Sequence, residues 1–120
     1  MAGLAAGEAV QAFIRDCLSQ EPGTGMELWL DAWDEALHDP DLAAAYAATD
    51  LRWHKLLETI IVEGVASGDF RCASPDKAAR QIFCMTMGYA DDVLMSADAM
   101  SAEQAAMEVS EAAALILRRA

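Results

Sequence analysis

Three ionisable residues in this chain have the types and the spacing that metal chemistry uses. Asp50, His54 and Glu58 recur every four residues, so on a helix their side chains would share one face. Imidazole and carboxylate groups placed in this way can hold a divalent cation. The same spacing beside Lys55 also suits ordinary ion pairs along a solvated helix, and we favour this second interpretation. We therefore predict no metal and no cofactor for this chain.

A second pair, Glu35 and His38, forms a Glu-x-x-His sequence. Di-iron helical bundles use this half-motif twice, together with two further inward-facing glutamates. The chain has only 2 histidines, and the pair has no twin elsewhere in the sequence. We expect Glu35 and His38 to lie on the solvated side of their helix.

The common signatures of enzyme catalysis are missing from the sequence. It contains no glycine-rich phosphate loop, no Gly-x-Ser-x-Gly elbow and no His-Glu-x-x-His motif. Cys17, Cys72 and Cys84 are far apart, which supports neither a zinc knuckle nor a redox pair. Cys84 also stands in an apolar run, where a thiol is normally inert. We predict no catalytic residues, and hence no enzyme.

Composition and charge narrow the class of protein further. The 8 basic and 20 acidic residues give a net charge of −12, which repels nucleic-acid phosphates and anionic membranes alike. With 120 residues, 55% of them hydrophobic, the chain can bury the core of a single domain. The start lacks the basic segment of a signal peptide, and the apolar stretch 112–117 is too short to cross a bilayer. We expect a cytoplasmic protein whose residues 1–120 form one domain.

The elements that position these residues are predicted to be helices. Proline stands where helices should end or begin, and Asp39 and Ser74 each precede a proline as capping residues. Ser101 with Gln104 forms a capping box, and Gly68 suits a left-handed helix end. The predicted helices span residues 4–20, 24–38, 40–67, 75–97 and 101–120. Because no alternating β-branched run occurs, we predict an all-α, five-helix bundle.

Helical periodicity also predicts which faces are buried. Trp29 and Trp33 fall on one face of helix 24–38, which begins with Thr24 and Glu27 as a second capping box. In helix 40–67 the predicted buried positions are Leu42, Tyr46, Thr49, Trp53, Leu56, Leu57, Ile60 and Gly64.

The last two helices are apolar almost all the way round, over residues 81–90 and 112–117. Such helices need cover on two sides, and a second copy of the chain would supply it through a two-fold interface. The alternative is that one of them lies at the centre of a single chain. The predicted interface residues are Tyr89, Val93, Leu94, Val109, Ala113, Ile116 and Leu117.

Aromatic and methionine side chains on the inner faces allow two interpretations. They can be core, or they can line an adjustable hydrophobic pocket, in which an indole N–H requires a partner. Phe13 belongs to this set. Our hypothesis for the pocket lining is Trp29, Trp33, Trp53, Phe83 and Met87.

Three ordered segments of the chain resemble a known family. They are WLDAWDEALHDPDL at 29–42, LRWHKLLETIIVEGVASGDFR at 51–71 and SPDKAARQIF at 74–83. Together they resemble the C-terminal domain of TetR-family transcriptional regulators, and are most similar to the BetI-like subgroup. The EGVASGDF turn with the Ser-Pro helix start after it is the most specific part, and the resemblance extends over roughly residues 10–118.

This resemblance implies a helical domain that binds a small effector in an internal pocket and dimerises through its last two helices. In such repressors an N-terminal helix-turn-helix reads the operator, and we expect it to be absent from this chain. The effector would favour one of two conformations, so that helix 40–67 alters the spacing of the reading heads. BetI-like members respond to choline, a cation that aromatic rings can hold, but a larger hydrophobic effector is equally compatible.

Two other functions remain open on the sequence. The chain could act as a stand-alone helical dimer through protein–protein contact, for instance by forming mixed dimers with full-length regulators. A small helical enzyme would require a catalytic group that the sequence does not display.

Overall fold

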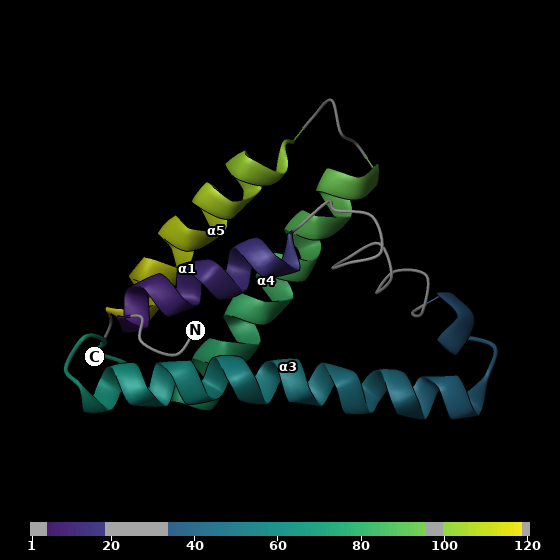
Figure 1. The fold of residues 1–120 in the computed structure, drawn as a ribbon, viewed down its shortest axis with the longest axis horizontal. Helices are drawn as coiled ribbons and strands as arrows, with labels where there is room; N and C mark the ends of the chain where they lie inside the picture. The colour runs from purple at the N-terminus through teal and green to yellow at the C-terminus, as the bar shows by residue number, and fades with distance from the viewer. Residues whose placement is uncertain (1–4, 19–33, 96–99, 119–120) are drawn as a thin grey trace.

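The computed structural model describes residues 5–18, 34–95 and 100–118, and its regular structure in these ranges is entirely helical (Figure 1). The helices are α1 (Ala6–Cys17), α3 (Pro40–Ala66), α4 (Pro75–Met95) and α5 (Ala102–Leu117). Residues 34–36 form a helical turn just before α3 and 37–38 a turn, while residues 24–33 of predicted helix 24–38 lie outside the described residues. The prediction of an all-α fold is confirmed.

Helix α1 packs against each of the other three, and α4 contacts both α3 and α5. The longest helix, α3, runs beyond the others, so that its first half projects from the bundle in Figure 1. Its buried residues are Leu57, Ile60, Ile61 and Gly64, all in the second half. The bundle therefore holds α3 by its C-terminal turns.

The core forms where the four helices meet. Its largest fully buried side chains are Phe13, Ile14, Leu57, Ile61, Ile82, Leu117, Val93, Val109 and Thr86. Burial of each large apolar side chain contributes roughly 1.5–3 kcal/mol. Thr86 is polar, but its hydroxyl donates to the Ile82 carbonyl at 2.7 Å, so it enters the core with its donor satisfied.

The predicted start of α3 is confirmed in atomic detail. Asp39 Oδ1 accepts hydrogen bonds from the backbone N–H groups of Asp41 and Leu42, at 3.0 and 3.3 Å. Pro40 occupies the first helical position, where the lack of an N–H has no consequence. At α4, the Ser74 hydroxyl accepts from the Lys77 N–H at 3.4 Å.

The capping box predicted for α5 is half formed. Ser101 Oγ accepts from the Gln104 N–H at 3.1 Å, as expected. The Gln104 side chain does not return to Ser101, because its amide donates to Glu108 Oε2 at 2.9 Å. The reciprocal bond of the motif is replaced by a contact one turn further along the helix.

The end of α3 is fixed by two glycines. Gly68 has φ +86°, the left-handed conformation predicted for it. The Phe70 N–H then donates to the Gly64 carbonyl at 3.0 Å, and its ring lies on Gly64 so closely that a Cβ there would overlap it. The chain leaves α3 packed against the helix it has just completed.

The predicted stripe on α3 is confirmed as buried only at Leu57, Ile60 and Gly64. Four of its other positions are half-buried, namely Leu42, Tyr46, Thr49 and Trp53. At Leu56 the prediction is wrong. Leu56 is 41% exposed, whereas Ile61, which was not predicted, is fully buried. Leu57, Ile60 and Gly64 mark the middle of the buried face, and Leu56 and Ile61 stand on its opposite margins. The bundle covers the Ile61 margin.

Candidate functional site

Three aromatic rings connect three helices within the described part of the chain. Trp53 of α3 meets Phe13 of α1 edge to face, with ring centroids 5.6 Å apart and planes at 69°. Phe13 in turn meets Phe83 of α4 at 6.2 Å and 60°. Such geometry suits the positive edge and negative face of aromatic rings. We call these residues the aromatic cluster.

The aromatic cluster contains two of the residues predicted to line an effector pocket. Phe13 and Phe83 are 0% and 6% exposed, so both are core, whereas Trp53 is half-buried and closes the cluster on its outer side. Met87 lies one turn after Phe83 on α4 and packs against the core while half-buried. Among the predicted pocket residues that the structure describes, Trp53 and Met87 are therefore the two that an incoming molecule could still touch.

Other pocket predictions were incomplete or remain untested. Trp29 and Trp33 lie outside the described residues, so their contribution stays a prediction. Phe13 was noted as an inner-face aromatic, but sequence reasoning did not assign it to the site. Only the packing of α1 against both α3 and α4 makes it the link between Trp53 and Phe83.

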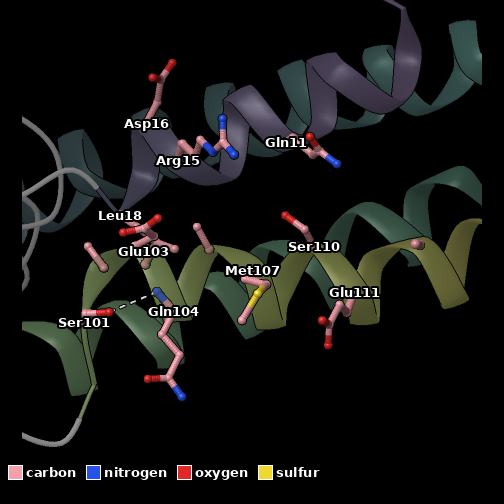
Figure 2. Close-up of a pocket in the computed structure, with 13 residues that line it drawn as sticks. Gln11, Arg15, Asp16, Leu18, Ser101, Glu103, Gln104, Met107, Ser110 and Glu111 are labelled. Carbon is pink, nitrogen blue, oxygen red and sulfur yellow. Dashed lines mark hydrogen bonds between the residues drawn. The ribbon is translucent and has the colours of Figure 1, made fainter.

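An open groove runs between α1 and α5, with a volume of about 1290 Å³ (Figure 2). On the α1 side stand Gln11, Arg15 and Asp16, and on the α5 side Glu103, Ser110 and Glu111. Of the residues predicted for the effector pocket, the described ones, Trp53, Phe83 and Met87, do not line it. No pattern in the sequence indicates this groove, because its walls come from opposite ends of the chain.

The residues predicted for a dimer interface divide into two groups. Val93, Val109, Ala113 and Leu117 are at most 2% exposed within a single chain, where they pack into its own core. Tyr89 and Ile116 are half-buried and retain surface to offer, while the Leu94 side chain lies outside the described part of the chain. Most of the apolar interface residues predicted on the last two helices are thus buried in the core of a single subunit.

The outer surface of α4 and α5 nevertheless has apolar content. Leu115 is 66% exposed, and it follows Glu108 by two turns on the same face of α5. Tyr89 of α4 reaches this face by donating its hydroxyl to Glu108 Oε1 at 3.1 Å. That bond to a carboxylate raises the pKa of the Tyr89 phenol above its ordinary value. Gly88 beside it has open space where a side chain would project.

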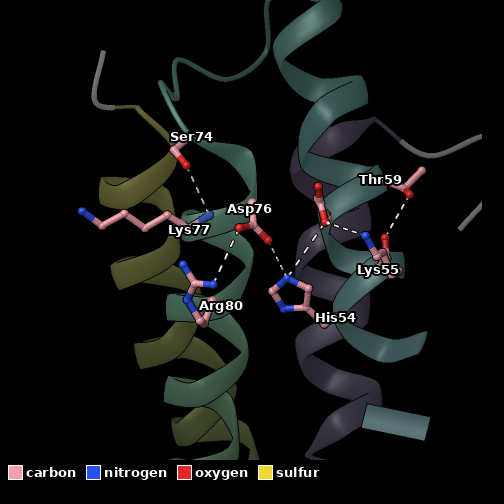
Figure 3. A network of polar contacts seen from close by, with 8 residues as sticks. His54, Lys55, Thr59, Ser74, Asp76, Lys77 and Arg80 are labelled. Carbon is pink, nitrogen blue, oxygen red and sulfur yellow. Dashed lines mark hydrogen bonds and ion pairs between the residues drawn. The ribbon is translucent and has the colours of Figure 1, made fainter. Parts of the chain in front are cut away.

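A polar cluster joins α3 to α4 at a different place (Figure 3). His54 Nε2 lies 3.1 Å from Asp76 Oδ1 and 4.0 Å from Glu58 Oε2. Lys55 Nζ approaches Glu58 at 3.9 Å. Ion pairs between neighbours on α3 were our favoured interpretation of this segment, and they are present. We call His54, Glu58 and Asp76 the His54 cluster.

The pKa values of two carboxyl groups here move in opposite directions. The hydrogen bond with His54, aided by the charge of Arg80, lowers the pKa of Asp76 below its ordinary value. Asp50 was grouped with His54 in the sequence, but desolvation raises the pKa of its carboxyl. Asp76, from α4, takes the place beside His54 that the sequence pattern had offered to Asp50.

The second histidine motif and the possibility of a membrane span can both be judged on the described residues. Glu35 and His38 are both exposed, as expected for a solvated face.

In the described ranges, no helix combines the length and apolar character that crossing a bilayer requires.

The chain matches a known protein family. A family model described as the C-terminal part of BetI-type transcriptional repressors matches residues 6–118, from the first residue of α1 to just past the end of α5. No curated protein and no solved structure matched the chain.

Proposed function

The chain belongs to the family of BetI-type transcriptional repressor C-terminal domains, and from this premise we propose that it binds a small effector and forms a homodimer to control a DNA-binding partner domain. The observation that carries this proposal is the family match over residues 6–118, which includes all four described helices. A role in transcription regulation comes with the family. The effector and the dimer are argued from the chain's own residues.

For the effector, we propose a site at the outer side of the aromatic cluster. Trp53 would supply an indole face, Met87 an adaptable contact and Phe83 the floor behind them. Trp29 and Trp33 would complete the lining, as the sequence predicts. Aromatic faces attract cations, and the net charge of −12 raises their local concentration, so a small cationic or hydrophobic effector fits this environment.

A thermal-shift screen of quaternary ammonium and hydrophobic compounds would identify a ligand, and calorimetry would then measure its affinity. We expect Trp53→Ala to weaken binding at least about tenfold, in line with loss of an aromatic anchor. Leu56→Ala is the matched control, because Leu56 lies on the same helix but is 41% exposed and outside the aromatic cluster. Equal affinity in wild type and Trp53→Ala would contradict this site.

For the dimer, we propose the outward face of α4 and α5 rather than the residues buried between them. Leu115, which is 66% exposed, would form its centre, and the half-buried Tyr89 and Ile116 would contribute their remaining surface. The open space at Gly88 would let a second backbone approach closely. Two-fold symmetry would place the same face on both copies, as is usual for homodimers.

Sedimentation velocity at micromolar concentration tests the dimer. We expect a wild-type dimer and a folded Leu115→Glu monomer, because the new carboxylates would be desolvated and unpaired at the interface. Val62→Glu should remain dimeric, since Val62 is 47% exposed on α3. A monomeric wild type, or a dimeric Leu115→Glu variant, would overturn the assignment of this face.

A further inference from the structure

We propose that His54, Glu58 and Asp76 form a binding site for a divalent transition-metal ion of the zinc class, which would bridge α3 and α4. His54 and Glu58 stand one turn apart on α3, and Asp76 lies in the first turn of α4. One potential ligand atom from each residue lies within 4.8 Å of the other two. This proposal uses none of the residues proposed for the effector site or the dimer face, and it depends on neither.

Both carboxylates approach the imidazole of His54. The same ring nitrogen, His54 Nε2, faces Asp76 Oδ1 at 3.1 Å and Glu58 Oε2 at 4.0 Å. Donors around a tetrahedral zinc ion, each about 2.0–2.2 Å from the metal, are separated from one another by roughly 3.4 Å. The separation of His54 Nε2 from Asp76 Oδ1 is already close to this value. The separation of His54 Nε2 from Glu58 Oε2 would require only a small side-chain adjustment.

Glu58 supplies an observation that the ion pairs do not explain. Its Oε2 atom is shielded from solvent and has no hydrogen-bond partner within the described part of the chain. The nitrogen atoms that approach it, Lys55 Nζ and His54 Nε2, stand at 3.9 and 4.0 Å, beyond hydrogen-bond distance. Buried side-chain oxygens normally accept at least one hydrogen bond, which these longer ion pairs do not provide. A cation between Glu58 and His54 would satisfy this oxygen directly.

The nearby basic side chains leave room for an ion. Lys55 and Arg80 are 66% and 59% exposed, so both can turn to water. Arg80 approaches the other carboxylate oxygen of Asp76, Oδ2, at 3.6 Å and leaves Oδ1 directed toward His54 (Figure 3). Two carboxylates would balance the charge of a divalent ion.

The donor types favour zinc and its neighbours over magnesium or calcium. Imidazole nitrogen suits zinc, cobalt, nickel and copper, whereas magnesium and calcium prefer an all-oxygen set. Three protein ligands would leave positions open for water. The sequence pattern drew attention to His54 and Glu58 together with Asp50, but it could not indicate Asp76, which comes from another helix, 22 residues after His54.

Cobalt(II) is the spectroscopic probe and zinc(II) the competitor, both added to the full chain. We expect one equivalent of cobalt to produce visible d–d absorption that zinc abolishes, and calorimetry to give a saturable zinc isotherm. Because no thiol belongs to the set, the near-ultraviolet charge-transfer band of a cobalt thiolate should not appear. Such a band would place the ion on a cysteine and overturn the site.

Matched variants decide which residues hold the ion. His54→Gln and Glu58→Gln should each weaken zinc binding more than about tenfold, and zinc should no longer raise their melting temperature. His38→Gln removes the other histidine, which is exposed, and Asp50→Asn removes the carboxylate one turn before His54. Both controls should bind zinc like the wild type.

Circular dichroism without metal establishes whether each variant is folded. If His54→Gln does not fold, the nearly isosteric Glu58→Gln still tests the site. No saturable zinc binding by the wild type would mean that the cluster is an ion-pair network only. Unchanged binding in both His54→Gln and Glu58→Gln, or a loss in His38→Gln, would likewise overturn the proposal.

Discussion

At Gly64 a single hydrogen atom in place of a side chain allows the chain to fold back onto α3. A Cβ at this position would overlap the Phe70 ring and come within 2.9 Å of the Ala6 methyl group. We expect Gly64→Ala to lower the free energy of unfolding by about 1–3 kcal/mol, as overpacking of a core does. Urea denaturation measures this change.

Gly7→Ala is the control for this substitution. Gly7 also lies in a helix, but no atom stands within 4 Å of the position that a Cβ would take, so the added methyl group meets open space. We expect no loss of stability there, and a gain of up to about 1 kcal/mol from the higher helix propensity of alanine. A Gly64→Ala variant as stable as Gly7→Ala would show that Phe70 moves aside freely.

The thiols should differ in reactivity for reasons of environment alone. Burial, with a smaller contribution from the charge of Asp16, raises the pKa of the Cys17 thiol to about 12. Alkylation requires the thiolate, which at pH 8 would then be about one part in ten thousand of Cys17. Cys84 is exposed. We expect iodoacetamide to label Cys84 in the native protein and Cys17 only after unfolding, as measured by peptide mass spectrometry. Equal labelling of both in the native state would contradict this packing.

At the scale of elements, the start of α5 is capped by the hydroxyl of Ser101. Ser101 Oγ satisfies the Gln104 N–H, which otherwise has no partner within its own helix. We expect Ser101→Ala to lower the free energy of unfolding by about 1 kcal/mol. Ser110→Ala makes the same change within the body of α5, away from its cap, and should alter stability by no more than about 0.5 kcal/mol. Equal losses in the two variants, measured by urea denaturation, would indicate that the cap contributes nothing.

Helix ends were predictable because local residues determine them. Asp39 binds N–H groups two and three residues ahead, and Gly68 adopts its left-handed φ at the end of the same helix. No distant contact is needed for either. The starts of α3, α4 and α5 and the end of α3 could therefore each be predicted from only a few consecutive residues.

The distribution of buried faces was less predictable, because it depends on which helices become neighbours. Val109 and Leu117 belong to an apolar pattern that suits a core or a subunit interface equally, and packing of α5 against α1 and α4 places them in the core. The same limit applies to sites. Asp50 is near His54 in sequence, but Asp76 is its partner in the fold, through a contact between two helices.

At the scale of the whole molecule, net charge should govern the strength of self-association. Each chain carries −12, so two copies of the proposed dimer repel one another at long range. Salt reduces this repulsion, because the screening length falls from about 30 Å at 0.01 M to about 3 Å at 1 M. Burial of apolar groups such as Leu115, by contrast, does not weaken when simple salt is added. We therefore expect the dimer dissociation constant to decrease several-fold as sodium chloride rises from about 0.02 to about 0.5 M.

Sedimentation equilibrium at a series of salt concentrations measures this dependence, and two charge variants locate its origin. Glu111 is exposed on α5, close to the proposed dimer face, whereas Glu63 is exposed on α3. Glu111→Gln should tighten the dimer at low salt and flatten its salt dependence, because it removes repulsion at short range. Glu63→Gln removes the same charge from the more distant α3 and should have the smaller effect. A dimer that weakens as salt rises would instead indicate that ion pairs between subunits, formed by residues such as Arg118 and Glu111, outweigh the repulsion between the two acidic chains.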